Sequence, residues 1–409
     1  MKRIIDHIKD KLLLPLWFQE NNSFNKIFKL YIDYCSKFPN PFRTKFLDIG
    51  ERLLYIFVSF TCIFNNLTVT MYTISGKEKH SEKKINVLYI GKNEIDEYVI
   101  SLFFSENPII ERIGIGKLRK IKEYERKYQS TVDLILVDVH RFYRRFLQQQ
   151  KYVVLPKWVS LSIDLNKPFD RIKKEFSSSA KKDIKRIRKI GYSYSIKKDL
   201  EDIKYFYTHM YRPYTLWRHG KHAEIVNYDG IRNIVIRRAF LMYIMLDGRA
   251  IAGSVLRKRN KKLFGAYLGI SNEGKKYYDQ SLIPSIYYFN LLYAKEHGFN
   301  ELAIGKSRPF LNDGGLQFKK KWNIFVYPTP IQFSETIAIR ITHFSPSVER
   351  FLLHNPFIYY NKGGKLQGAI FLDDKKQNFS KKKKNIRKNF AISGLDKKIL
   401  TIKEFNKLN

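Results

Sequence analysis

Apolar residues recur every third or fourth position over residues 168–191, which predicts one or two amphipathic helices. The apolar positions are Phe169, Ile172, Phe176, Ala180, Ile184, Ile187 and Ile190. Gly191 is expected to end the helix, because glycine readily takes the left-handed conformation found at helix C-termini. Lysine and arginine fill the remaining positions, so the opposite face of this helix is predicted to be strongly basic.

Downstream of Gly191 the pattern alternates between strands and helices. Asp247-Gly248 predicts a two-residue hairpin between the strands "FLMYIML" and "AIAGSVLRK". Pro284 suits the first turn of a following helix, and Gly298 is expected to close it. The expected order is a strand (192–198), two helical stretches (199–217 and 227–239), three strands (240–246, 250–258 and 263–270), a helix (281–298) and a strand (301–305).

The rest of the chain divides by composition into four further segments. Short β-branched runs, "INVLYI" and "VDLILVDVH", with helical patterns between them predict a separate α/β lobe over 84–165. Residues 1–83 are expected to be short helices broken by the proline-containing stretch 38–42. Residues 331–374 form a C-terminal extension, and the lysine-rich tail 375–409 is expected to be partly disordered.

Charge and cysteine content narrow the setting in which the chain works. The net charge is +38, from 76 basic and 38 acidic residues. Such an excess favours polyanionic partners, and it is equally consistent with a basic surface that only solubilises the protein. Cys35 and Cys62 are too few for a disulfide framework, so a cytoplasmic location is expected. The sequence does not indicate an oligomeric state.

The most apolar run, residues 53–64, is shorter than the roughly 20 residues that span a bilayer. A buried core element is the favoured interpretation, and peripheral contact with the inner face of a membrane is the alternative. His219 and His222 are the only close histidine pair and have no third ligand beside them, so no metal is expected.

The tripeptide Gly305-Lys306-Ser307 matches the end of a nucleotide-binding P-loop, but its surroundings do not. The first glycine of such a loop would stand at position 300, which is Asn300. Pro309 and the glycines that follow would prevent the helix that the loop requires. A nucleotide-hydrolysing site is therefore excluded, and the tripeptide is interpreted as a turn after the strand 301–305.

The order of elements over 192–330 resembles that of a GNAT acyltransferase domain, and three sequence stretches are similar to FemAB-like members. These are "SSSAKKDIKRIRKIGYSYSI" (177–196), "YTLWRHGK" (214–221) and "SLIPSIYYFNLLYAKEHGFNELAIGKSRPFLNDGGLQFKKKW" (281–322). The resemblance implies an α/β (α+β) fold of tandem lobes, each a mixed sheet flanked by helices. The complete GNAT domain spans 166–330, and residues 84–165 form a degenerate first lobe.

The resemblance leaves the acyl donor open. Many GNAT enzymes hold acyl-CoA with a glycine-rich loop after the fourth strand, whereas the corresponding stretch here, "NEGKKYYDQSLIP", has only Gly274. Fem-type enzymes, which take aminoacyl groups from tRNA, also lack the full motif. The expected donor is acyl-CoA such as acetyl-CoA, with aminoacyl-tRNA as the alternative.

Candidate site residues follow from the slot that GNAT folds open between their fourth and fifth strands. Tyr267 could donate a proton to the leaving group, and Lys306 and Arg308 could bind a developing oxyanion or a phosphate. Asp279 and Asp313 are the nearest candidates for a general base, although both suit turn or cap positions. A cationic face predicted to bind a diphosphate or RNA consists of Lys181, Lys182, Lys185, Arg186, Arg188 and Arg218.

The resemblance implies transfer of an acyl or aminoacyl group to an amine or hydroxyl of a cell-envelope precursor, such as a phosphorylated or lipid-linked sugar or peptide. The alternative is an inactive GNAT-like protein that binds RNA or an anionic membrane. The small number of acid–base candidates favours this alternative, while the complete set of core elements is compatible with both.

Overall fold

The computed structural model describes most of the chain from residue 67 onward. The described ranges are 67–92, 94–220, 223, 225–330, 335–372, 390–401 and 404–405. Three expectations lie outside the described residues: the helices before residue 67, the apolar run 53–64 and the lysine-rich run 375–389. In the described part of the chain, no helix is both long and apolar enough to cross a bilayer.

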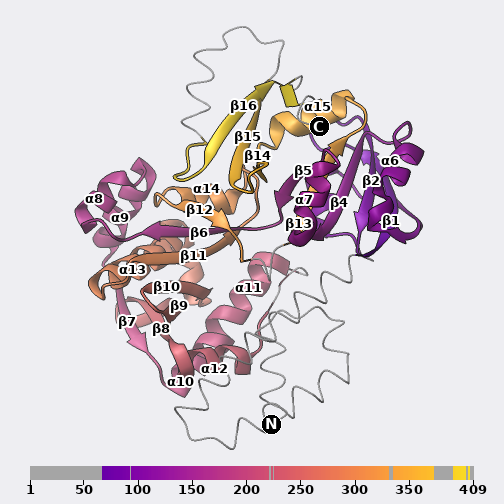
Figure 1. The fold of residues 1–409 in the computed structure, drawn as a ribbon. Helices are drawn as coiled ribbons and strands as arrows, with labels where there is room; N and C mark the ends of the chain where they lie inside the picture. Colours follow the sequence, from indigo (N-terminus) through magenta and orange to yellow (C-terminus); the bar gives the residue numbers. More distant parts are fainter. Residues whose placement is uncertain are drawn as a thin grey trace, which may run out of the picture. The chain divides into compact units, whose positions relative to one another are not determined.

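The chain forms two compact units, each with a mixed sheet flanked by helices (Figure 1). The described residues of the first unit are Leu161–Gly305 and Lys321–Ile324. Those of the second unit fall within 67–160, 306–320 and 325–405. The second unit is therefore built from segments on both sides of the first unit in sequence.

In the first unit, the strands β6, β11, β10, β9, β8 and β7 lie side by side in that order. Their bounds are β6 Val159–Asp164, β7 Ser193–Lys197, β8 Ala239–Leu246, β9 Arg249–Arg259, β10 Lys262–Ile270 and β11 Glu301–Ser307. β7 to β10 form an antiparallel meander, and β11 is parallel to β10. This order and pairing confirm the topology expected from the GNAT resemblance.

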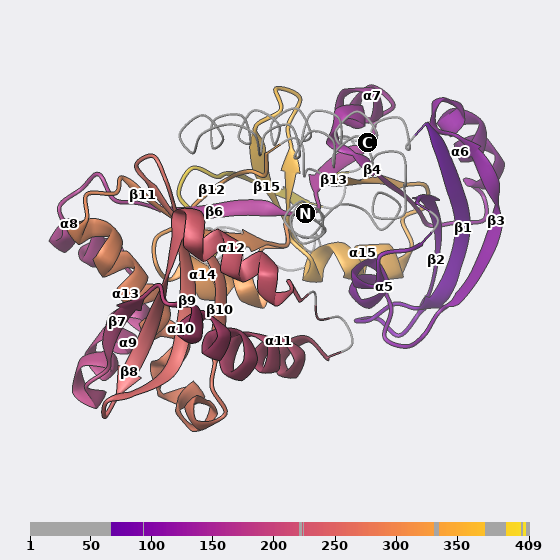
Figure 2. The same cartoon turned by 90° about the horizontal axis from the view of Figure 1, so that it is seen from below.

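Helices cover both faces of this sheet, as alternation along β8 shows (Figure 2). Leu241 and Tyr243 face the cluster formed by α10, η3 and α12, whereas the ring of Phe240 lies 4.7 Å from that of Tyr293 on α13. Successive strand residues point to opposite faces, so α13 and α12 lie on opposite sides. The helices are α8 Phe169–Glu175, α9 Ser178–Ile190, α10 Leu200–Tyr205, η3 Phe206–Tyr211, α11 Arg212–His219, α12 Tyr228–Arg238, η5 Glu273–Tyr277, η6 Tyr278–Leu282 and α13 Ile283–Glu296.

Local signals in the sequence placed several boundaries correctly. Asp247 and Gly248 both have positive φ, and Leu246 pairs with Arg249 across the turn, as expected for the hairpin. Gly191 ends α9 with φ 85°. β11 differs from the expectation, because it continues through the tripeptide to Ser307 instead of ending at 305.

The second unit contains a six-stranded sheet of order β3-β1-β2-β4-β13-β5. Its strands are β1 Thr68–Lys77, β2 Lys84–Gly91, β3 Ile109–Lys117, β4 Leu134–His140, β5 Val153–Pro156 and β13 Glu335–Ile341. Helices were expected up to residue 83, which is wrong for β1. The stretch "TVTMYTISGK" is rich in β-branched residues and pairs with β2 and β3 along most of its length.

Strand β13 comes from the segment predicted as a C-terminal extension, yet it lies in the interior of this sheet. It is antiparallel to both of its neighbours, β4 and β5. A small sheet of order β14-β15-β16 comprises Phe357–Tyr360, Leu366–Leu372 and Asp396–Thr401, and β12 is Phe325–Pro328. The helices are α5 Glu97–Phe103, η1 Leu118–Lys120, α6 Ile121–Tyr128, η2 Arg141–Tyr143, α7 Arg144–Gln149, α14 Gly314–Lys320 and α15 Pro346–His354.

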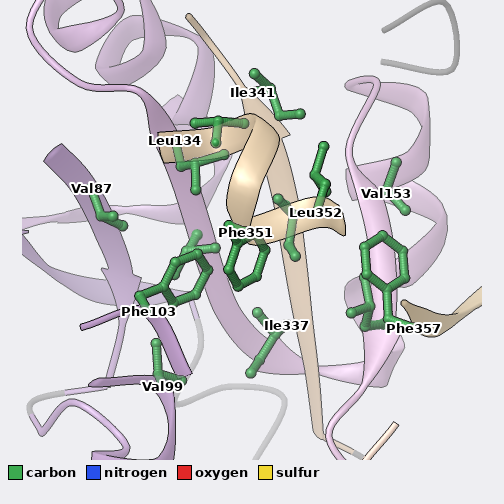
Figure 3. Close-up of a cluster of buried hydrophobic side chains, with 14 of the residues drawn as sticks. Val87, Val99, Phe103, Leu134, Val153, Ile337, Ile341, Phe351, Leu352 and Phe357 are labelled. Atoms are coloured by element: carbon green, nitrogen blue, oxygen red, sulfur yellow. The ribbon is translucent and has the colours of Figure 1, made fainter. Parts of the chain in front are cut away.

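The core of the second unit lies between the six-stranded sheet and the helices α5 and α15 (Figure 3). Phe103 of α5 and Phe351 of α15 stack with their ring centroids 4.1 Å apart. Ile337 and Ile341 of β13 belong to the same buried cluster. Segments distant in sequence thus bury one continuous apolar core.

Candidate functional site

Strands β10 and β11 run parallel but pair with each other only near their starts. The last registered pair is Phe264 opposite Ala303, although β10 continues to Ile270 and β11 to Ser307. The edge of β10 beyond Phe264 is therefore left unpaired by β11. Such an edge can form strand-like hydrogen bonds with an extended ligand that contains amide groups.

A β-bulge lies at the point where β10 leaves β11. The register between β10 and β9 shifts between Gly265 and Tyr267, and a bulge bends its strand and increases the local twist. Tyr267 is half-buried, and its ring lies 5.4 Å from that of Tyr211 on η3. Its predicted role as proton donor stays a prediction.

The C-terminal half of β10 is held tightly against η3. A Cβ atom on Gly269 would lie 2.5 Å from the backbone of Met210 and Tyr211. A Cβ atom on Gly274, in the loop after β10, would lie 2.1 Å from the carbonyl oxygen of Ile251. Glycine is required at both positions because the backbones approach too closely for any side chain.

The loop between β10 and α13 is anchored by α9. The Asp183 carboxylate accepts a hydrogen bond from Ser281 Oγ at 2.8 Å and pairs with Lys321 Nζ at 2.7 Å. Ser281 has φ 65°, so this bond holds a strained backbone in place. Arg186 donates to the carbonyl oxygen of Asp279 at 3.1 Å.

The end of α11 reaches the same loop. Arg218 donates to the hydroxyl of Tyr278 at 2.6 Å, one residue before the carbonyl of Asp279 that Arg186 contacts. Trp217 is half exposed and carries Lys275 over its ring at 5.5 Å. The structure thus brings Arg186 and Arg218, two members of the predicted cationic face, to neighbouring residues of one loop.

The other members of this face lie on the exposed side of α9. Lys182, Lys185 and Arg188 point into solvent, and Lys181 donates to the carbonyl oxygen of Lys174 at 2.8 Å. The side chain of Asp279 is also exposed, and its backbone carbonyl oxygen accepts the hydrogen bond from Arg186.

Arg308 belongs to the second unit, where its guanidinium lies between two aromatic rings. It is 3.9 Å from the ring centroid of Tyr98 and 4.0 Å from that of Trp158, and Asp96 is 3.7 Å away. Planar stacking on both faces fixes the guanidinium, while the N–H donors at its edge stay in the plane between the rings. Its side chain is 18% exposed, so part of it remains accessible to solvent.

A buried lysine stands next to this arginine and shares its acidic partner. Lys157 Nζ lies 2.6 Å from Asp138, 3.4 Å from Glu335 and 3.5 Å from Asp96. Burial alone would lower the pKa of Lys157, but these carboxylates outweigh burial and raise it. The Tyr89 hydroxyl donates to Asp138 at 2.6 Å, and burial followed by that carboxylate raises the pKa of the phenol.

Lys306 is the penultimate residue of β11, and Asp313 and Lys319 lie in the short segment of the second unit that follows this strand. Asp313 Oδ1 accepts from the backbone N–H of Leu316, which is a helix-capping contact at the start of α14. Lys319 donates to the carbonyl oxygen of Lys306 at 2.7 Å. Burial lowers the pKa of Lys319 to about 8, against an opposing effect of Asp313, so a substantial fraction of this amine is neutral at mildly alkaline pH.

Several of these residues escaped sequence-based reasoning. The role of Asp183 was not predicted, because lysines and arginines surround it in the sequence. An acidic residue within a basic helical run is nevertheless a signal of a specific partner. Lys157 and Asp138 carry no local signal in the sequence, because their contact depends on the order of strands in the sheet. No cluster of histidine, cysteine, aspartate and glutamate suitable for a metal occurs among the described residues.

Comparison with known proteins gives remote likenesses only. No protein-family model and no curated protein matches the chain. Among solved structures, FemX has 15% identity and a TM-score of 0.37, covering 62% of this chain and 80% of its own. L-PGS from Bacillus licheniformis has 13% identity and a TM-score of 0.33, covering 67% and 86%. The PaiA N-acetyltransferase from Thermoplasma acidophilum, in complex with coenzyme A, has 15% identity and a TM-score of 0.27, covering 36% and 99%. These TM-scores are too low to support a functional argument.

Proposed function

We propose that the chain is an acyltransferase of the GNAT type that transfers an acyl or aminoacyl group to an amine or hydroxyl of a cell-envelope precursor. The observation that carries the proposal is the separation of β10 from β11 beyond Phe264 and Ala303. It leaves a strand edge in the middle of the sheet, where an extended donor arm containing amides could pair. The substrate class rests on the resemblance of the sequence stretches quoted above.

In this proposal the donor is acyl-CoA or aminoacyl-tRNA, and both carry phosphates. The loop that holds Arg186 and Arg218, together with the exposed cations Lys182, Lys185 and Arg188 of α9, would attract either donor. The lysines and arginines of this basic face would neutralise the phosphate charge of either donor, so the face does not distinguish acyl-CoA from aminoacyl-tRNA. The acceptor would be a phosphorylated or lipid-linked precursor.

Groups for the chemical step would come from β10, from β11 and from the residues that follow β11. Tyr267 on β10 is proposed to protonate the leaving group, and Lys306 on β11 to stabilise the oxyanion. Arg308, fixed between its two aromatic rings, would bind an anionic group of the acceptor. With Asp313 committed to a helix cap and Asp279 exposed, Lys319 is the better candidate for the proton acceptor, since its lowered pKa suits that role.

Two measurements test the proposal. Native mass spectrometry of the freshly purified protein should detect bound acyl-CoA, charged tRNA or a phosphorylated precursor. Transfer from radiolabelled acetyl-CoA and from aminoacyl-tRNA should then be followed with cell-envelope precursors as acceptors, in the wild type and in Lys306→Ala/Arg308→Ala. A loss of about 100-fold in kcat/KM is expected for the double variant, the size typical of removing oxyanion and anchoring contacts.

Charge removal on α9 separates donor binding from chemistry. Lys182→Gln/Lys185→Gln should raise KM for the donor and leave kcat nearly unchanged, whereas Arg126→Gln/Lys127→Gln on α6 removes two exposed charges of the second unit and should change neither. If the wild type transfers no acyl group from any donor while the α9 variant loses polyanion binding, the chain is a binding protein and the acyltransferase proposal is wrong.

A further inference from the structure

The second unit has an open surface pocket of about 410 Å³ that the acyl-transfer proposal does not use. Its wall is formed by the turn after β1, by α5 and by the end of α15. Lys79, His80, Tyr98, Leu102, Asn312 and His354 are among the residues that line it. The volume is within the range of small-molecule sites and far exceeds what one or two water molecules fill.

Two histidines stack within this pocket. The imidazoles of His80 and His354 lie 4.3 Å apart between centroids and are nearly parallel, at 10°. His354 Nδ1 is 3.0 Å from the carbonyl oxygen of Arg350. Because a carbonyl oxygen can only accept, Nδ1 donates in this contact, and the second ring nitrogen of His354 is available for a ligand.

Positive groups dominate the surroundings of the pair. Lys79 donates to the carbonyl oxygen of Ser101 at 3.1 Å, which keeps its ammonium at the rim, and Arg350 lies one turn before His354 on α15. One carboxylate is also close, because Oε2 of Glu78 accepts from the backbone N–H groups of His80 and Ser81. Burial, followed by the neighbouring His354, lowers the pKa of His80, and Glu78 opposes this effect.

Two stacked imidazoles repel each other when both are protonated, and an anion beside them offsets that repulsion. The ring of Tyr98 and the side chain of Leu102 add an apolar wall to the same pocket. We propose that this pocket is a binding site for a small organic anion, with a phosphate or carboxylate on His80, His354 and Lys79 and an apolar body against Tyr98 and Leu102.

This site is distinct in its residues from the acyl-transfer groups, apart from one shared side chain. Tyr98 lines the pocket and also stacks on Arg308. Binding should be coupled to proton uptake, because the anion favours the charged imidazoles. Affinity should therefore rise as the pH falls from about 8 to about 5.5, through the ordinary range of histidine, by up to about tenfold per pH unit for each proton taken up.

Isothermal titration calorimetry of the whole chain with phenyl phosphate and with benzoate, each across that pH range, tests the proposal, with benzyl alcohol as the neutral probe. At least one of the two anions should bind at least about tenfold more tightly than the alcohol at low pH. In His80→Phe/His354→Phe, which keeps stacked rings without titratable nitrogens, binding should weaken at least tenfold and lose its pH dependence. His343→Phe, an exposed histidine of the same unit outside the pocket, should behave as the wild type.

Circular dichroism and thermal melting of each variant check that it is folded. If the double variant is unfolded, His80→Gln replaces it. NMR titrations of His80 and His354 should give higher pKa values when the anion is bound than when it is absent. A merely structural stack would not show this difference. The proposal is overturned if neither anion binds the wild type at roughly 10 mM, or if binding is the same in the histidine variants. Both results are independent of whether the chain transfers acyl groups.

Discussion

At the scale of single residues, Lys157 is 5% exposed and surrounded by three carboxylates. Removing one partner of a buried ion pair is costly, because the other charge stays buried without compensation. Lys157→Met should therefore lower the free energy of unfolding by about 3 kcal/mol, the lower end of the range seen for such pairs. Chemical denaturation measures this loss, and the exposed Lys83→Met is the control and should change stability by less than about 0.5 kcal/mol. Equal stabilities would mean that the network contributes nothing net.

Lys319 carries a prediction about pH. Its pKa is lowered to about 8 from 10.5, first by burial, while Asp313 raises it. Between these two values the unfolded chain binds more protons than the folded chain, so this group makes stability rise with pH across that window. Amine acetylation followed by peptide mass spectrometry should show Lys319 reacting with a midpoint near pH 8. In Asp313→Asn, which preserves a capping side chain, the midpoint should move to lower pH. A midpoint that moves upward would contradict the assigned charge effect.

At the scale of elements, the contact between β10 and η3 depends on Gly269. An added Cβ would lie 2.5 Å from the η3 backbone, which cannot move without displacing the whole helix. Gly269→Ala should lower the melting temperature by several degrees, corresponding to about 2–3 kcal/mol of overpacking. Gly265→Ala in the same strand is the matched control, since its nearest atom would be 3.6 Å away in ordinary contact. Similar melting temperatures for the two variants would show that η3 can shift away from β10.

Elements with strong local signals could be predicted from the sequence, and those defined by distant partners could not. The periodicity of α9, the left-handed Gly191 and the Asp247-Gly248 turn are properties of a few adjacent residues, and all were predicted correctly. β1 was not predicted, because the polar residues at its end are typical of a loop. The strand is stabilised by its pairing with β2 and β3. The aromatic stack around Arg308 joins residues 98, 158 and 308, and no local pattern shows that they meet.

At the scale of the whole molecule, the second unit is discontinuous in sequence, and β13 is the strand that joins β4 to β5 in its sheet. β13 hydrogen-bonds to β4 on one side and β5 on the other, and it buries Ile337, Ile339 and Ile341. A chain that ends at residue 330 should therefore expose the facing edges of β4 and β5 and lose the second unit, although every element of the first unit is retained. Hydrogen exchange should show protection of β8 and β9 but rapid exchange of β2 and β4.

The opposite result would separate the two possible roles of residues after 330. If β2 and β4 stay protected in the shortened chain, the segment from β13 onward is an addition to a sheet that is stable without it. Restoring 331–409 as a separate polypeptide should recover protection of β4 only if the sheet depends on β13. A variant of that polypeptide with Ile337→Asp/Ile339→Asp places charges in the buried cluster and should fail to do so. The comparison tests whether the fold of this unit is set by a strand that its own N-terminal half does not contain.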